Sequence, residues 1–174
     1  MLMKMLEAGG VKIISDGIRR PDDDNPKGYY ELEKVKSLDK KMDKSWLKEN
    51  RGKAVKIVSY FLRYLPDSNH YKVIFLERNL EEIMASQRKM LINRGKPIDP
   101  DGDQDMIRNF ENHLLKIKNT VLTKPWFEVL FINHRHVLTN PQEQAQKINR
   151  FLNGKLDEDK MASVVDPKLY RNRK

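Results

Sequence analysis

The sequence predicts an α/β domain built on a parallel sheet, and three observations support this. Apolar runs of strand length alternate with segments whose apolar residues recur at helical spacing. Two of these runs, 71–76 and 127–132, are nearly continuous, as in strands that a parallel sheet buries on both faces. The 174 residues suffice for one domain with its own core, and no internal repeat is visible. We therefore expect residues 1–174 to form a single domain with helices on both faces of the sheet.

The first part of the chain reads as a helix, a short strand and a loop. Residues 1–8 carry apolar side chains at helical spacing and are followed by two glycines, but no capping residue precedes them. The run 11–14 predicts a short strand, and 19–28, rich in turn-forming residues, predicts a polar loop. A short helix is expected within 29–38.

The middle of the chain carries the next strands and two long helices. A strand is predicted over 53–59, where β-branched residues follow a glycine, and a helical turn over 60–66. After the strand 71–76, Asn79 reads as an N-cap, with Glu82 completing a capping-box-like pair. That helix ends at the glycine at position 95. Apolar residues from Met106 to Val121 form a second helical stripe, which the strand 127–132 follows.

Capping residues predict two further helices near the end of the chain. Asn140 is placed to cap a helix, Pro141 suits its first position, and Gly154 suits the position just after its end. Asp157 is expected to cap a last short helix.

Composition and charge limit the kinds of partner and chemistry that this protein can have. The 34 basic and 25 acidic residues give a net charge of +9, which favours anionic partners in general. Cys is absent, which excludes disulfides and thiolate chemistry and fits a reducing cytoplasm. No apolar run approaches the roughly 18 residues that a membrane span needs, and the N-terminus lacks the features of a signal peptide.

Arg78 occupies the point where a buried strand gives way to a helix, and Ser86 follows two turns later. In parallel sheets, ligands bind at the carboxyl ends of the strands. The first turn of a helix presents unpaired N–H groups, and a guanidinium is a planar set of donors suited to phosphate. The alternative is a solvated arginine beside a helix cap and a serine at a helix edge.

The segment 71–91, "YKVIFLERNLEEIMASQRKML", and the ending 164–173, "VVDPKLYRNR", resemble the sulfotransferase superfamily. The similarity is closest to small bacterial members and extends through 3–10, 24–31 and 52–59, "MKMLEAGG", "DNPKGYYE" and "GKAVKIVS". The family takes its sulfuryl group from 3′-phosphoadenosine 5′-phosphosulfate and uses no metal. The fold that the resemblance implies is a three-layer parallel sheet of the P-loop nucleoside triphosphate hydrolase type.

The resemblance also assigns the cofactor residues. An arginine at a strand end and a serine eight residues later bind the cofactor's 3′-phosphate in this family, which implies that role for Arg78 and Ser86. The family's "PRSGTS"-like phosphosulfate loop and the strand before it are absent from the sequence. Three explanations stay open: a truncated enzyme, a natural domain that has lost catalysis, or a partner that completes the sheet edge. The lack of a cap before the first helix favours truncation.

On the acceptor side, the resemblance implies a general base and a cation near the sulfate. Cytosolic members use a histidine in a K-T-H-type sequence; Lys56 matches its lysine, but Val58 or Ser59 stands where the histidine would be. Other members use a glutamate after the first helix, which makes Glu31 the candidate base. The alternatives are an exposed carboxylate that opens a short helix and a strand-end lysine.

Metal binding is not expected. His134 and His136 have a spacing that can ligate a metal, but no third ligand lies near them in sequence. Residues 99–105 resemble a calcium loop, yet Gly102 is misplaced and Phe110 stands at the twelfth position.

The leading hypothesis is a sulfuryl transferase that acts on a hydroxyl or amine of a small molecule or polymer, although the missing loop argues against activity of this form alone. The alternative is a non-catalytic module that binds adenosine 3′,5′-bisphosphate or a protein partner. Nucleic-acid binding has only the net charge in its favour, since no recognition motif is present. A cytoplasmic location is expected, and a homo-oligomer is left open.

Overall fold

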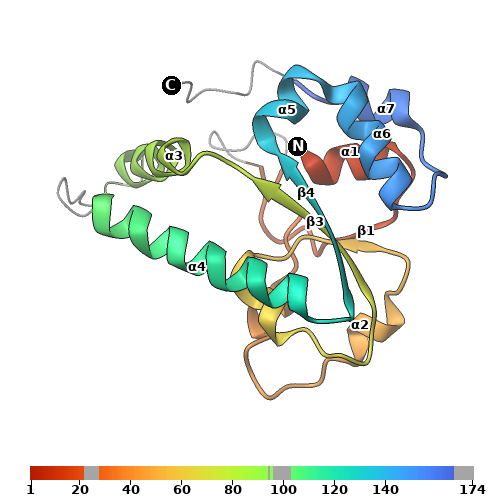
Figure 1. The fold of residues 1–174 in the computed structure, drawn as a ribbon, viewed down its shortest axis with the longest axis horizontal. Helices are drawn as coiled ribbons and strands as arrows, with labels where there is room; N and C mark the ends of the chain where they lie inside the picture. The colour runs from red at the N-terminus through yellow and green to blue at the C-terminus, as the bar shows by residue number, and fades with distance from the viewer. Residues whose placement is uncertain (22–27, 94, 96–102, 167–174) are drawn as a thin grey trace.

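The computed structural model describes residues 1–21, 28–93, 95 and 103–166 (Figure 1). In chain order the elements are α1 (Leu2–Ala8), β1 (Ile13–Ile14), the 3₁₀ helix η1 (Glu33–Ser37), α2 (Ser45–Glu49), β2 (Ala54–Val55), the 3₁₀ helix η2 (Ser59–Tyr64), β3 (Tyr71–Glu77), α3 (Leu80–Asn93), α4 (Asp103–Thr123), β4 (Phe127–Asn133), α5 (His134–Thr139), α6 (Pro141–Phe151) and α7 (Glu158–Ser163). Residues 99–102 of the stretch that resembles a calcium loop, and residues 167–173 of the C-terminal motif, lie outside the described residues.

The strands form two parallel pairs, which confirms the prediction of a mixed α/β protein with parallel strands. In the first pair, β1 and β2 align Ile13 with Ala54. In the second, β3 and β4 pair along seven residues, from Tyr71 opposite Phe127 onward. Among the described residues, no strand pairing joins the two sheets. The predicted strand over 53–59 is reduced to the short β2, because the chain turns into η2 a few residues later.

Two apolar clusters lie on opposite sides of the strands. Side chains alternate along β3, so Phe75 belongs to the first cluster and Ile74 packs against the second. The first cluster is completed by η1, α2, η2 and α4, and the second by α1, α5, α6 and α7. Both strand pairs contribute to both clusters: Val55 packs against the first and Ala54 against the second. The core therefore holds the two small sheets in one layer of the molecule.

Most predicted helices are confirmed, and their caps explain where they begin. The Asn79 side chain accepts a hydrogen bond from the Glu82 N–H (3.2 Å), as expected for the N-cap of α3. Asp157 caps α7 in the same way by accepting from the Lys160 N–H (3.0 Å). The Glu82 carboxylate contacts Arg78, whose Nε lies 3.3 Å from Glu82 Oε2.

The remaining expectations need correction. Asn140 does not cap α6 with its side chain, because it also ends α5, where its N–H binds the His136 carbonyl (2.8 Å). Gly154 lies one position further than predicted, since Asn153 (φ 77°) takes the left-handed position after α6. The helix predicted within 29–38 is the shorter 3₁₀ helix η1, and α2 and α5 were not predicted at all.

The longest helix in the described part of the chain is α4, with 21 residues. Neither α4 nor any other helix described combines the length and apolar character that crossing a bilayer requires.

Candidate functional site

Arg78 lies where the sequence places it, between the end of β3 and the start of α3. Its Nε contacts Glu82 Oε2 at 3.3 Å, one turn into the helix. The exposed fraction is 27% for the Arg78 side chain and 9% for the Glu82 side chain. The guanidinium is therefore reachable from solvent, while its carboxylate partner is nearly buried beneath it.

The charge of Arg78 acts on His134, which follows the end of the neighbouring strand β4. Because Glu77 at the end of β3 aligns with Asn133 of β4, Arg78 and His134 follow paired positions. Burial and, to a smaller extent, the nearby Arg78 cation lower the pKa of His134 to about 4, against the opposing effect of the Glu82 carboxylate. This edge of the β3–β4 sheet thus combines the Arg78 cation, its Glu82 partner and the start of α3, whose first N–H groups favour an anion.

Ser86 is half-buried in the second turn of α3, and its hydroxyl makes no hydrogen bond to the described residues. Arg78 therefore lies at the junction of β3 and α3, and Ser86 lies two turns further along the chain, within α3. No contact within the described part of the chain joins either of them to Glu31 or Lys56.

Glu31 and Lys56 are brought together, although 25 positions separate them in sequence. The Lys56 Nζ lies 3.6 Å from Glu31 Oε1 and donates a hydrogen bond to the Tyr29 carbonyl (3.0 Å). Arg19 binds the same Glu31 oxygen at 3.0 Å, and its guanidinium lies 3.4 Å from the centre of the Tyr29 ring. Glu31 Oε2 makes no hydrogen bond to the described residues. The cluster of Arg19, Tyr29, Glu31 and Lys56 therefore holds one oxygen of the Glu31 carboxylate, and the other oxygen has no hydrogen-bond partner among the described residues.

A second tyrosine anchors the segment that presents Glu31. The Tyr30 hydroxyl donates to Glu7 Oε2 (2.5 Å) and so ties this segment to α1. Burial, together with that hydrogen bond, raises the pKa of Tyr30 to about 12. The backbone of Tyr30 is left-handed (φ 52°), an uncommon state for a bulky residue that the surrounding structure must hold in place.

Sequence reasoning missed an imidazole next to Ser59, one of the two positions at which the family's histidine would stand. Ser59 begins η2, and its Oγ lies 3.0 Å from His113 Nε2. Burial lowers the pKa of His113, which favours the neutral form that can accept a proton. His113 lies on α4, 54 residues away, so no local spacing reveals the pair. Arg19 was missed for a similar reason, since it belongs to a charged loop with no diagnostic pattern.

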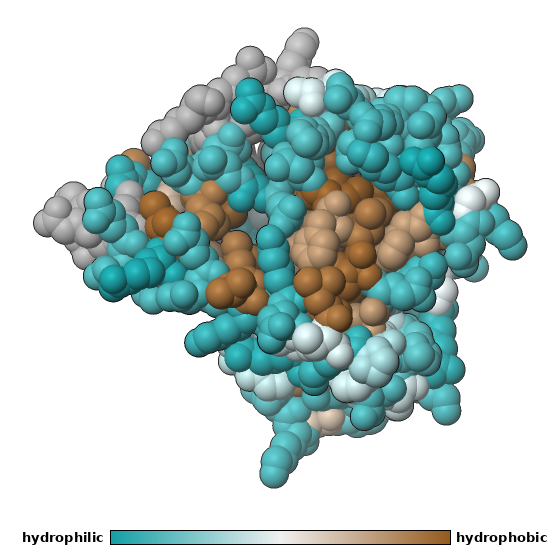
Figure 2. Space-filling model, in the orientation of Figure 1, coloured by the Kyte–Doolittle hydropathy of each residue, from teal (hydrophilic) through white to brown (hydrophobic). Residues whose placement is uncertain are grey.

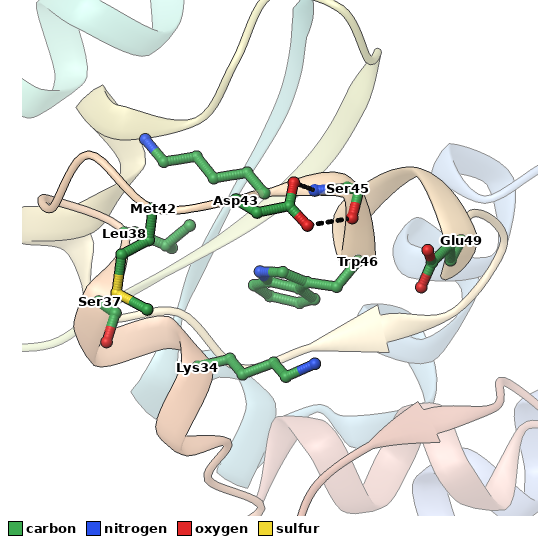
Figure 3. A pocket seen from close by; sticks show the side chains of 9 residues that line it. Lys34, Ser37, Leu38, Met42, Asp43, Ser45, Trp46 and Glu49 are labelled. Atoms are coloured by element: carbon green, nitrogen blue, oxygen red, sulfur yellow. Dashed lines mark hydrogen bonds between the residues drawn. The ribbon is translucent and has the colours of Figure 1, made fainter.

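The pocket in Figure 3 lies elsewhere, between η1 and α2. Its volume is about 180 Å³, and Trp46 crosses it between Lys34 and Asp43. Asp43 is fixed by two hydrogen bonds to Ser45, at 2.9 and 2.6 Å. Cofactor pockets usually measure about 300–1,000 Å³. This pocket is therefore too small for a nucleotide, and none of the predicted site residues lines it.

Metal ligation finds no support in the described residues, which contain no group of three or more histidine or carboxylate side chains that could hold a metal ion. His134 and His136 both lie in α5, which begins directly after β4.

Comparisons with protein-family models, with curated proteins and with solved structures found no match for this chain. The resemblance to sulfotransferases therefore rests on the residues themselves, above all on Arg78 and Ser86 at the junction of β3 and α3.

Proposed function

We propose that this chain is a sulfotransferase-like protein that binds the adenosine 3′,5′-bisphosphate part of 3′-phosphoadenosine 5′-phosphosulfate. The observation that carries the proposal is the position of Arg78, a solvent-reachable guanidinium at the carboxyl end of β3 and the start of α3. Ser86, two turns along the same helix, supplies a hydroxyl without another hydrogen-bond partner among the described residues. The fold proposed with it is the three-layer P-loop type.

The residues fit the 3′-phosphate half of this cosubstrate. A phosphate that bridges Arg78 and the first turn of α3 would gain charge-assisted hydrogen bonds, in competition with the Glu82 carboxylate. The phosphosulfate half has no equivalent, because the sequence contains no glycine-rich loop of the phosphate-binding kind. The chain's own residues therefore account for nucleotide recognition better than for chemistry.

For transfer to a hydroxyl or amine, the chain offers a base and a cation. Glu31, through Oε2, would take the acceptor's proton while the acceptor oxygen or nitrogen bonds to sulfur and the bond from sulfur to the bisphosphate oxygen breaks. Lys56, held near Glu31, would supply positive charge to the transferring group. His113, whose Nε2 lies 3.0 Å from Ser59 Oγ, is a second candidate base.

A non-catalytic binding module is the second candidate function. The contacts of Glu31 with both Arg19 and Lys56 favour it, because such an ion-pair cluster also serves to fix a loop. In this case Arg78 and Ser86 would bind the bisphosphate and no transfer would follow.

The test is a calorimetric titration of the full chain with adenosine 3′,5′-bisphosphate and, separately, with adenosine 5′-monophosphate. We expect micromolar binding of the first and binding at least tenfold weaker of the second, because only the first carries the 3′-phosphate. Equal affinity for the two nucleotides, or no binding of either, would rule out the 3′-phosphate site. A sulfuryl-transfer assay with a phenolic acceptor then separates the enzyme from the binding module.

A further inference from the structure

The cavity between η1 and α2 is lined by hydrogen-bond donors that have no acceptor among the described residues. Lys34 and Ser37 belong to η1, and Trp46 belongs to α2. The Lys34 Nζ forms no hydrogen bond or ion pair there, and the Ser37 hydroxyl and the Trp46 Nε1 donate to no group in that part of the chain. Although Trp46 is only 7% exposed, its Nε1 is not sealed from solvent. These donors are therefore available to a ligand in the cavity.

Carboxylates line the same cavity. Asp43 accepts hydrogen bonds from the Ser45 N–H (2.9 Å) and from the Ser45 hydroxyl (2.6 Å). These bonds and, to a smaller extent, the charge of Lys34 lower the pKa of Asp43, so this carboxylate is ionised at neutral pH. Glu49, at the end of α2, makes no hydrogen bond or ion pair to the residues that the structure describes. Figure 3 shows Asp43 and Lys34 on opposite sides of the Trp46 ring.

The charges of the described lining balance one another. Lys34 and Lys44 carry positive charge, and the Lys44 Nζ is held by the Tyr64 carbonyl (3.0 Å). Asp43 and Glu49 carry negative charge. A ligand of one sign is attracted by one pair of side chains and repelled by the other, whereas a zwitterion matches both. Figure 2 shows a mainly hydrophilic surface in the part of the molecule where Figure 1 draws α2.

Volume and apolar lining limit the size of the ligand. The cavity measures about 180 Å³. A protein cavity of about 150 Å³ holds benzene, so this one has room for roughly six to nine non-hydrogen atoms. The buried Leu38, the Met42 side chain and the Trp46 ring supply apolar contacts within it. A zwitterion of this size with an apolar side chain therefore fits both the volume and the lining.

We propose that this cavity binds a free α-amino acid with a short branched apolar side chain, such as leucine. The carboxylate of the ligand accepts hydrogen bonds from Lys34, Ser37 and Trp46 Nε1. Its ammonium group faces the carboxylates of Asp43 and Glu49. None of the residues assigned to nucleotide binding or to sulfuryl transfer lines the cavity, so this site does not depend on the proposed function.

NMR of the indole N–H groups of the full chain tests this proposal, because the sequence has two tryptophans and Trp126→Phe assigns their signals. The probe is L-leucine. The controls are 4-methylpentanoate, which lacks the ammonium group, and 3-methylbutylamine, which lacks the carboxylate. We expect the Trp46 signal to shift saturably with leucine, while the Trp126 signal stays unchanged. Each control should bind about tenfold or more weakly, because each leaves one set of charges without its partner.

A pair of variants makes the test specific to the cavity. Lys34→Met keeps the length of the side chain but removes its charge, and should weaken leucine binding about tenfold or more. The matched control is Lys40→Met, which removes the same charge from an exposed lysine outside the lining. Three results would overturn the proposal: no shift of the Trp46 signal with leucine, equal affinity for leucine and either control compound, or equal losses in the two variants.

Discussion

Arg78 contacts a carboxylate that a bound phosphate would have to displace. The Arg78 Nε and Glu82 Oε2 are 3.3 Å apart, and Glu82 is nearly buried. A partly buried pair of this kind gains little net stability, because desolvation of the charges offsets their attraction. We therefore interpret Glu82 as a residue that orients the guanidinium and lowers its affinity for anions.

The first prediction concerns this carboxylate. Glu82→Gln keeps an oxygen that can accept from Arg78 but removes the negative charge, so the affinity for adenosine 3′,5′-bisphosphate should rise roughly fivefold, equivalent to about 1 kcal/mol. Calorimetric titration measures the change. The matched control is Glu81→Gln, which alters the same net charge on the exposed side of the same turn. An equal gain in both variants would show a general charge effect and no specific role for Glu82.

The second prediction is a pH dependence of stability that His134 produces. Its pKa falls from 6.5 to about 4 on folding, mainly because of burial. Between these values the unfolded chain binds the proton and the folded chain does not, so the free energy of unfolding decreases as the pH falls below about 6.5. For one such group the free energy of unfolding changes by at most about 1.4 kcal/mol per pH unit. The change stops near pH 4, because below it the folded chain binds the proton as well.

Urea unfolding of the chain and of His134→Gln, at several pH values from 7.5 to 4, measures this contribution. The variant should lose less stability than the unmodified chain over this range. His113, whose pKa is also lowered, acts in the same direction in both proteins and cancels in the comparison. Parallel stability curves would contradict the role assigned to His134.

At the scale of elements, the contact between α1 and α7 depends on a glycine. Gly9 follows α1 with ordinary helical backbone angles (φ −75°), so a side chain is not excluded by conformation. A Cβ there would lie 2.6 Å from Met161 Cγ, on the fully buried side chain of α7. Close packing of the two elements is the reason for a glycine at this position.

The third prediction follows from this contact. Gly9→Ala should lower the free energy of unfolding by about 1–3 kcal/mol, as overpacking of a core does. A double-mutant cycle with Met161→Ala provides the control, since removal of the long side chain relieves the clash. The Gly9→Ala change should then cost less in the Met161→Ala background. Additive losses in the cycle would mean that the two residues do not meet as described.

The elements with strong local signals could be predicted from the sequence. Continuous apolar runs gave β3 and β4, and helical spacing with a capping asparagine gave α3. The errors arise where tertiary contacts override local pattern. The predicted strand 53–59 is short because the chain turns and places Ser59 beside His113. Asn140 does not cap α6 with its side chain, because its backbone ends α5, where its N–H bonds to the His136 carbonyl.

At the scale of the whole molecule, the strand layer lies between two apolar clusters and carries the candidate sites at its polar rim. The position of Arg78 could be predicted, because a strand end and a helix start adjoin in sequence. The approach of Glu31 to Lys56 was not predicted; the family resemblance only named each of them as a candidate on the acceptor side. The contacts of Arg19 with Glu31 and of His113 with Ser59 were not predicted, since they join residues that only the fold brings together.

The net charge of +9 bears on ligand binding as a property of the entire chain. It attracts every anion to some degree, and this long-range attraction is screened by salt. A specific phosphate site must therefore be distinguished from general attraction by a variant that loses one charge at the site and a variant that loses one elsewhere. Arg108 offers the second change, because its side chain is 73% exposed on α4 and pairs only with the exposed Asp105 among the described residues.

The most direct test of the account is a calorimetric titration of adenosine 3′,5′-bisphosphate into the chain, into Arg78→Ala and into Arg108→Ala at one salt concentration. Loss of the charge-assisted bonds to the 3′-phosphate should cost Arg78→Ala about 2–4 kcal/mol, or roughly thirty- to a thousandfold in affinity, while Arg108→Ala binds as the unmodified chain does. Unchanged affinity in Arg78→Ala, or equal losses in both variants, would contradict the assignment of a phosphate site at the junction of β3 and α3.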